Sequence, residues 1–352
     1  MESTLAAAFE GRRHETSRAI GVALGLTHDR LSSELVEAAI AGAADLGRDA
    51  CVVRPGDDQS QLGVLLGIGY PGSFLPVFAA SADCRRVIWV GEPLRPRGEP
   101  PGGPLTHVAR SPLMDYLMHP LRPFKDAPLP GRLERIRASA TLERQGARNL
   151  RDLARLAQLV DRVVVTSRDR RAVLVEQGVN AEAVPFGYSS ATAGLITPPG
   201  LGSRDLDFVS LGILDSRVAG RRSVVEGWRA EEPRLTVLDG VWGEERGDLL
   251  RRSRVVLNVG RTPGNFVGMR LVLAIAAGAV VVSEPMTDPF PFVPGVHFVE
   301  ASLEGLLDAA RELCADEPRR RRIADAGQAL LRGELSMGQC LRRALGLGPD
   351  PV

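Results

Sequence analysis

Residues 254–284 read RVVLNVGRTPGNFVGMRLVLAIAAGAVVVSE, and this stretch decides the fold class. Its first apolar run, residues 254–259, is typical of a buried strand. Residues 268–277 form a helix-length segment that stops at Gly278, and residues 279–283 are a second apolar run. A strand, a helix and a strand joined by short connections predict a parallel β–α–β unit.

The same alternation extends upstream over most of the chain. Apolar runs of strand length are separated by stretches whose apolar residues have helical spacing. These runs are residues 19–26, 50–53, 62–68, 86–90, 161–167, 206–212 and 235–238. A Pro- and Gly-rich linker over residues 197–203 divides the series in two. We therefore expect an α/β protein with two Rossmann-like domains, whose parallel sheets face each other across a cleft.

The expected domains follow from that linker. The N-terminal domain spans residues 1–195 and contains an excursion, residues 93–131, that holds ten prolines. The C-terminal domain spans residues 204–335. Residues 336–352 predict a last helix that packs back on the N-terminal domain.

The charge balance excludes several classes of function. With 44 Lys and Arg against 43 Asp and Glu, the net charge is +1, so no global attraction to nucleic acid or to an anionic membrane is expected. Lys125 is the only lysine and lies in the Pro-rich excursion, which excludes a P-loop. An anionic ligand would therefore be held by arginines, backbone amides and helix N-termini.

The sequence contains no pattern typical of a metal site, a signal peptide or a membrane-spanning helix. The four cysteines are scattered without metal-ligand spacing. The first residues contain no long apolar segment of a signal peptide, and no stretch is long and apolar enough to cross a membrane. We expect a cytoplasmic protein with no metal site. One D-x-D sequence, Asp205 to Asp207, precedes a strand rather than following one and is interpreted as a chance match.

Two segments carry a resemblance to a known family. The first is residues 161–167 with the helix after them and Val184-Pro185-Phe186-Gly187. The second begins with the stretch quoted above and continues through Phe292-Val293-Pro294-Gly295 and residues 322–327. Over residues 160–330 the ordered series resembles glycosyltransferases of the GT-B type, especially the CgeB-like, group 1 branch. The resemblance implies a hexosyltransferase-like enzyme of bacterial secondary metabolism whose donor is a nucleotide-diphosphate sugar such as a UDP-sugar, with no other cofactor.

Several residues would form the donor site. Gly212 ends a strand, and the loop after it brings Arg217 and Arg221 to the start of a helix, which suits a diphosphate. Gly268 would let a backbone amide approach a phosphate closely. Arg270 lies in the first turn of the next helix, where a cation opposes the helix dipole, so an anionic partner from ligand or protein is expected.

The chain departs from the family pattern at one point. Many members that retain the anomeric configuration carry two glutamates eight positions apart, the second of which binds the donor ribose. The matching positions are Asn265 and Leu273, and neither is a carboxylate. Glu284, at the carboxyl end of the next strand, is the candidate substitute.

The candidate catalytic bases lie in the N-terminal domain. His28 follows the first strand and precedes Asp29, and Glu92 follows the strand at residues 86–90. His107 and His119 lie in the excursion and would reach an acceptor only if that segment folded over the cleft. His297 is interpreted as structural.

Three functions stay open at this stage. The first is a metal-independent glycosyltransferase, whose acceptor could be a small molecule, a peptide or a lipid-linked intermediate. The second is a non-catalytic protein of the same fold that binds a ligand or partner, which the missing glutamates favour. The third is a nucleotide-sugar epimerase. The stereochemical course and the oligomeric state are not set by the sequence.

Overall fold

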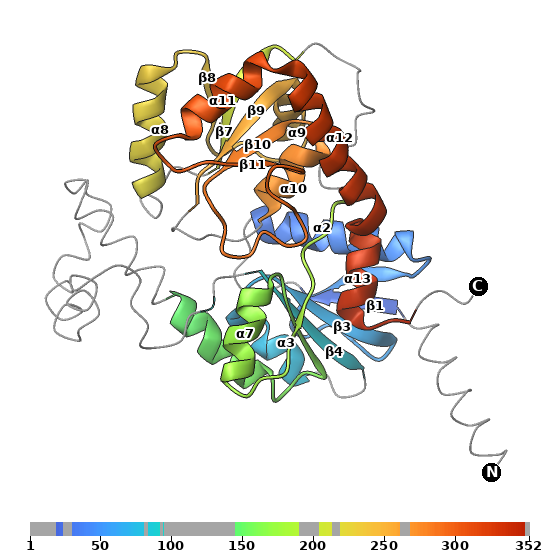
Figure 1. Ribbon diagram of the computed structural model, residues 1–352. Helices are drawn as coiled ribbons and strands as arrows, with labels where there is room; N and C mark the ends of the chain where they lie inside the picture. Colours follow the sequence, from blue (N-terminus) through green and yellow to red (C-terminus); the bar gives the residue numbers. More distant parts are fainter. Residues whose placement is uncertain are drawn as a thin grey trace, which may run out of the picture. The chain divides into compact units, whose positions relative to one another are not determined.

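The computed structural model describes residues 19–23, 30–80, 84–91, 94, 145–189, 204–212, 219–260 and 268–348. These residues divide into two compact units (Figure 1). Unit 1 holds the described residues up to Gly91, those from Arg151 to Ser189 and those from Leu331 onward. Unit 2 holds the others, chiefly Arg204 to Leu330. Each unit is built on a parallel sheet, which confirms the expected α/β class.

Unit 1 has a six-stranded sheet in the order β2-β1-β3-β4-β5-β6. Its strands are β1 (Ala19–Ala23), β2 (Ala50–Val53), β3 (Leu62–Ile68), β4 (Arg85–Val90), β5 (Arg162–Val165) and β6 (Glu182–Ala183). Its helices are α2 (Arg30–Asp45), the 3-10 turn η1 (Pro71–Ser73), α3 (Leu75–Ala80) and α7 (Arg168–Glu176), together with the second half, from Arg151, of a helix over 145–156. All residues of β3 are buried, as expected for a central strand of a sheet covered on both faces.

Unit 2 has a five-stranded sheet in the order β11-β10-β9-β7-β8. In chain order its elements are β7 (Leu206–Leu211), α8 (Ala219–Glu231), β8 (Leu235–Leu238), α9 (Gly243–Arg252), β9 (Ser253–Asn258), α10 (Met269–Ala276), β10 (Val280–Ser283), β11 (Val299–Glu300), α11 (Leu306–Ala315) and α12 (Glu317–Glu334). The stretch quoted first is the β9-α10-β10 unit. Gly278 ends its helix with φ +74°, a conformation that favours glycine.

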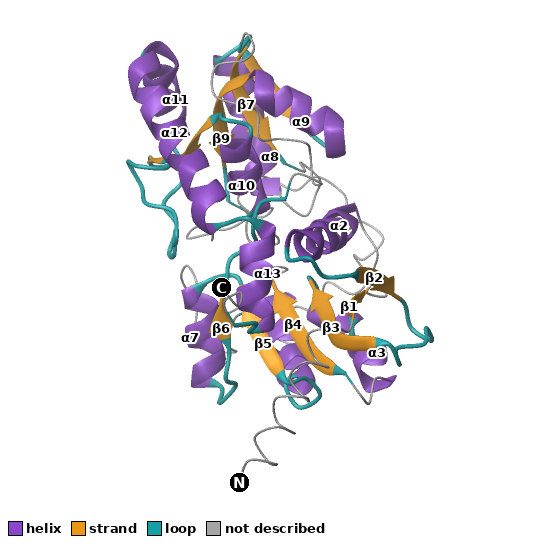
Figure 2. Ribbon diagram, turned by 90° about the vertical axis from the view of Figure 1, so that its right-hand side faces the viewer, coloured by secondary structure: helices purple, strands orange, loops and turns teal. Residues whose placement is uncertain are grey.

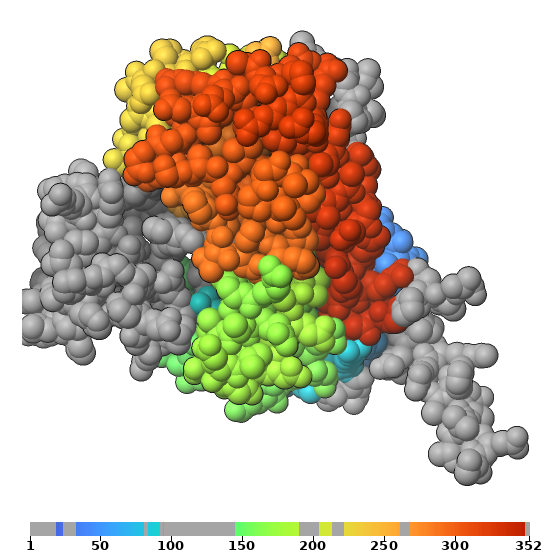
Figure 3. Space-filling view, viewed as in Figure 1, coloured from blue at the N-terminus to red at the C-terminus, as the bar shows by residue number. Residues whose placement is uncertain are grey.

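The core of unit 2 joins one face of this sheet to three helices. Phe208 and Val255 of the sheet pack with Trp228 of α8, Leu313 of α11 and Ile323 of α12. Helices α9 and α10 contact strands β7, β9 and β10. The side chains of the orange and red segments close over unit 2 on the side seen in Figure 3. The site described below therefore rests on a sheet that is packed against helices.

The last helix, α13 (Met337–Leu345), belongs to unit 1 and lies against α2 (Figures 1 and 2). Ser336 caps it by accepting a hydrogen bond from the backbone amide of Gln339 at 3.3 Å. Gly42 of α2 and Gly338 of α13 let the two backbones approach, since a Cβ on Gly42 would lie 3.0 Å from the Met337 carbonyl carbon. The chain thus passes from unit 2 into unit 1 within α12.

Candidate functional site

The carboxyl edge of the unit 2 sheet is the place where this topology leaves room for a ligand. From β7 the chain runs to β8 on one side and then crosses to β9 on the other. Ligands of open parallel sheets bind at such a reversal, outside the carboxyl ends of the two central strands. The residues that follow β7, β9 and β10 therefore define the candidate site.

Gly212 marks the exit from β7. Its φ is +143°, which favours glycine, and its amide donates to the carbonyl oxygen of Leu238 at 3.2 Å. Arg221 lies in the first turn of α8, on the far side of the loop that follows. Arg217 and the side chain of Arg221 lie outside the described residues, so their contact with an anion stays a prediction.

Polar side chains replace apolar ones where β9 and β10 end. Asn258 is 8% exposed, and its amide nitrogen donates to the hydroxyl oxygen of Ser283 at 2.9 Å. The Ser283 hydroxyl donates in turn to the carbonyl oxygen of Glu284 at 2.9 Å. This chain of hydrogen bonds joins the two strand ends. The sequence analysis did not identify it, although a polar residue ending each of two apolar runs was its signal.

Arg270 and Glu284 form hydrogen bonds with the two ends of the same peptide group, between Val259 and Gly260. Arg270 donates through one guanidinium nitrogen to the carbonyl oxygen of Val259 at 3.1 Å and to that of Leu211 at 3.2 Å. Glu284 accepts from the amide of Gly260 at 2.8 Å. The structure therefore brings together two residues that the sequence proposed separately. The two partners of Arg270 given above are neutral backbone carbonyls, so the anionic partner expected from the sequence stays a prediction.

Gly268 begins α10 without a side-chain cap. Its φ of −114° and ψ of 171° are extended, and a Cβ built on it would meet no atom of the described residues within 4 Å. None of the described residues therefore fills the space beside this position at the first turn of α10. Leu273, by contrast, is 2% exposed within the same helix. A buried leucine offers no oxygen to a ribose, so no carboxylate serves that role at this position.

Four sequence-predicted residues lie outside the described residues altogether. They are His28, Glu92, Arg217 and Asn265. Their roles as base, phosphate ligand and donor contact stay predictions. His107 and His119 also lie outside the described residues.

The remaining candidates are structural where the structure describes them. His297 accepts a hydrogen bond from the Val293 amide at 2.9 Å and so closes a turn. Asp205 pairs with Arg252 at the amino end of β7, and hydrogen bonds from Arg252 lower the pKa of Asp205. Within the described part of the chain, no group of three or more His, Cys, Asp or Glu side chains could hold a metal ion.

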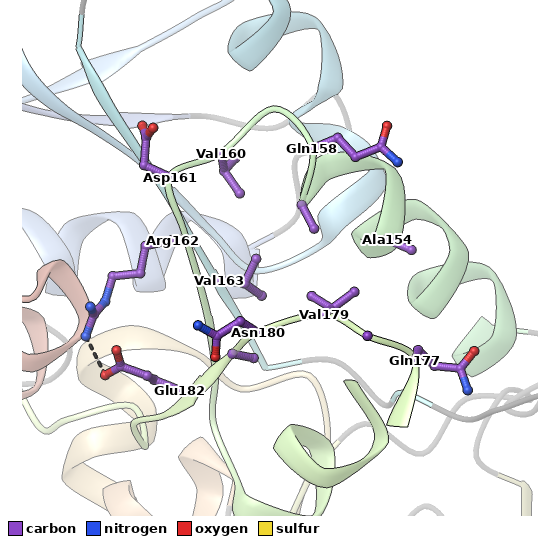
Figure 4. Close-up of a pocket in the computed structure, with 13 residues that line it drawn as sticks. Ala154, Gln158, Val160, Asp161, Arg162, Val163, Gln177, Val179, Asn180 and Glu182 are labelled. Carbon is purple, nitrogen blue, oxygen red and sulfur yellow. Dashed lines mark hydrogen bonds and ion pairs between the residues drawn. The ribbon is translucent and has the colours of Figure 1, made fainter. Parts of the chain in front are cut away.

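A groove of about 520 Å³ lies elsewhere, at the amino ends of β5 and β6 in unit 1 (Figure 4). Val160, Val163 and Val179 lie toward its middle, whereas the carboxamides of Gln158 and Gln177 point outward. Its charged lining residues contact other protein groups, namely Asp161 with Arg86 and Arg162 with Glu182. Its polar groups do not converge, so we assign no ligand to it.

Comparison with families of known proteins gives one partial match. Residues 205–346, less than half of the chain, match the model of a glycosyl transferase-like family. No curated protein matches the sequence significantly. Among the helices that the structure describes, none has the length and apolar character to cross a bilayer.

Solved structures share the fold of the chain. TarM of S. aureus is 11% identical with a TM-score of 0.52, over 81% of this chain and 54% of its own. Sucrose-phosphate synthase from Thermosynechococcus elongatus is 13% identical with a TM-score of 0.55, over 94% and 97%. HepE from Anabaena, in complex with UDP and glucose, is 12% identical with a TM-score of 0.56, over 94% and 98%. The chain spans about half of TarM and nearly all of the other two.

These findings identify the fold of the chain and a family match for residues 205–346. The chain has the two-sheet α/β fold of GT-B glycosyltransferases. Its resemblance to the group 1 branch of these proteins, inferred from the sequence, is confirmed by the family match of residues 205–346.

Proposed function

We propose that the protein is a glycosyltransferase that moves a sugar from a nucleotide-diphosphate donor to an acceptor bound by the N-terminal domain, without a metal ion. The observation that carries the proposal is the carboxyl edge of the unit 2 sheet. There the chain order of the sheet reverses between β7 and β9, and α10 begins at Gly268 without a side-chain cap, in a region that matches a glycosyl transferase-like family. The HepE structure with UDP and glucose supports a UDP-sugar as donor.

The reaction would be a direct displacement at the anomeric carbon. A base, His28 or Glu92, takes the proton of an acceptor hydroxyl. The acceptor oxygen bonds to the anomeric carbon while the bond to the diphosphate oxygen breaks, and the electron pair leaves with the diphosphate. Arg217, Arg221 and the amides at the start of α10 stabilise the charge on that leaving group. Arginines and a helix dipole neutralise a diphosphate without a metal.

The experiment is a thermal-shift screen of the purified protein with UDP, ADP, GDP, CDP and TDP and their sugar conjugates, without metal and then with Mg²⁺. A nucleotide at a hundred times its dissociation constant adds about 2.7 kcal/mol to the free energy of unfolding. We expect one base to raise the melting temperature selectively and without Mg²⁺. If no nucleotide raises it, the donor site is refuted.

A matched pair of variants tests the phosphate contact. Arg221→Ala is expected to weaken the shift by the selected nucleotide, because it removes a cation at the start of α8. Arg222→Ala is the control, since Arg222 is its exposed neighbour and pairs with Glu226 at 2.8 Å along the same helix. An equal loss of the shift in both variants would contradict a specific role for Arg221.

One observation favours a non-catalytic ligand-binding protein as the second candidate. The buried Leu273 stands where many relatives carry the ribose-binding glutamate. Nuclear magnetic resonance of the selected nucleotide sugar, with and without acceptor mixtures, separates the two candidates. Release of the nucleoside diphosphate with a new glycosidic bond assigns the enzyme, and tight binding without turnover assigns the binding protein.

A further inference from the structure

We infer that Arg270 and Glu284 form a charge clamp on the Val259–Gly260 peptide, and that through this peptide they set the affinity of unit 2 for a nucleoside diphosphate. They act as positioning residues and not as ligands of the nucleotide. The second half of the inference rests on the proposed function, and the first half stands on the hydrogen bonds alone.

The geometry of the clamp follows from which ends of the peptide are held. The Val259 carbonyl accepts from the Arg270 guanidinium at 3.1 Å, and the Gly260 amide donates to Glu284 at 2.8 Å. The cation thus faces the negative end of the peptide dipole and the anion faces its positive end. Hydrogen bonds to ionised groups are roughly twice as strong as neutral ones. The orientation of this one peptide plane is therefore held from both sides.

The clamp acts where the sheet itself ends. The last paired residues of β7 and β9 are Ser210 and Leu257. The carbonyls of Leu211 and Val259 lie beyond that pair, and Arg270 donates to both of them. The guanidinium therefore continues the link between the two central strands after their backbone ladder has stopped. It fixes the exits of both strands at the reversal of the sheet.

The position of Arg270 in α10 supports a role of this kind. It is the only charged residue of that helix and lies in its first turn, where the helix dipole disfavours a cation. The two carbonyls and the Glu284 carboxylate across the peptide supply the compensating negative charge. The hydrogen bonds from Arg270 to these two carbonyls thus account for a cation at a position that the helix dipole disfavours.

Two residues of the same unit provide matched controls. Glu300 accepts a backbone hydrogen bond from Met286 at 3.2 Å, at the end of the neighbouring strand β11. Arg204 donates to the carbonyl oxygens of Arg251 and Ala277 at 3.0 Å, near the amino end of β9. Each resembles one half of the clamp, and neither contacts the Val259–Gly260 peptide in these hydrogen bonds.

The test compares Glu284→Gln, Arg270→Gln and Arg270→Lys with the controls Glu300→Gln and Arg204→Lys. The first readout is hydrogen exchange of the Gly260 amide in the nucleotide-free protein. We expect roughly tenfold faster exchange in Glu284→Gln and Arg270→Gln, the effect of losing a charge-assisted hydrogen bond. Arg270→Lys keeps a cation and stays closer to the parent protein. Unchanged exchange in both Gln variants would overturn the clamp.

The second readout is the dissociation constant of UDP, measured by calorimetry. Both Gln variants are expected to weaken binding several-fold while the controls do not. Because the two residues hold one peptide, the double variant is expected to lose less than the product of the single losses. Strictly multiplicative losses would overturn a shared clamp. If the parent protein selects a nucleoside diphosphate other than UDP, calorimetry uses that nucleotide. If it binds none of the five, the proposed function and the link to affinity fail together, whereas the exchange readout still decides the clamp.

Discussion

Glu232 is a single buried carboxylate held by two arginines at the end of α8. It is 5% exposed, and it accepts hydrogen bonds from Arg234 at 2.8 Å and from Arg311 at 3.2 Å. The hydrogen bond from Arg234, and then that from Arg311, lower its pKa from 4.5 to about 2. The folded protein thus keeps this side chain ionised at pH values where the unfolded chain binds a proton.

This shift predicts a specific acid sensitivity. The stabilisation is fully present above pH 4.5, the ordinary pKa, and is lost as the pH falls toward the folded value of about 2. Glu232→Gln should therefore lower the melting temperature at pH 7 and flatten its decline between pH 5 and 2. Thermal denaturation across that range checks the prediction. Glu226→Gln, which alters an exposed pair on the same helix, should decline in parallel with the parent.

For single residues, the sequence indicated which side chains belong to the site but not the groups to which they donate hydrogen bonds. The position of Arg270 in a first helical turn indicated an anionic partner, and the structure shows two carbonyls that no local pattern could locate. Those carbonyls come from Leu211 and Val259, and only the pairing of β7 with β9 brings them together. Long-range register decides such contacts, and the periodicity of a single segment does not contain it.

At the scale of elements, a glycine allows the backbone of one segment to approach the start of α13 closely. Gly187 lies beside the start of α13, where the adjoining Tyr188 amide donates to the Leu335 carbonyl at 2.7 Å. A Cβ on Gly187 would lie 2.7 Å from the Ser336 oxygen and from the Met337 Cα. Both are backbone atoms, so the neighbouring chain would have to shift as a whole.

We therefore expect Gly187→Ala to lower the free energy of unfolding by about 1–3 kcal/mol. Gly227→Ala is the matched control, because Gly227 lies inside α8 and its Cβ would meet nothing within 4 Å. Alanine is favoured over glycine in a helix, so the control should gain about 0.5–1 kcal/mol. Urea denaturation of the two variants measures both signs. Equal stability of the two would refute the close approach.

The elements themselves were largely predictable because apolar runs and glycine stops are local signals. Proline is such a signal too, because helices α11 and α12 are separated at Asp316 and Pro318 lies in the first turn of α12. Proline is tolerated there because the first turn needs no amide donor. Strand β11 was not predicted, since two residues are too short for a visible alternation.

At the scale of the whole molecule, unit 1 is completed by the end of the chain. The side chains of α13 that are fully buried are Met337, Cys340, Leu341, Ala344 and Leu345. Three of them are large and apolar, and their burial stabilises the fold by on the order of 5 kcal/mol. That is comparable with the net stability of many domains.

A fragment of residues 1–195 is therefore expected to fold poorly. It lacks α13 and exposes the side of α2 that this helix covers. The same fragment joined by a flexible linker to residues 331–352 should regain a cooperative thermal transition. Circular dichroism melting of the two fragments provides the comparison. A cooperative transition of equal midpoint in both would show that unit 1 does not need its last helix.

The passage of the chain through α12 has a consequence for recombination between relatives. The main segment of unit 2, from Arg204 to Leu330, is topologically an insertion, because Arg151 to Ser189 before it and the residues from Leu331 onward belong to unit 1. A crossover near residue 200 would exchange not only unit 2 but also α13, the helix that completes unit 1. A chimaera that exchanges this segment alone needs two junctions, and the second lies inside α12. At that junction the two parent helices must join without a change of helical phase, so that the same residues face the core.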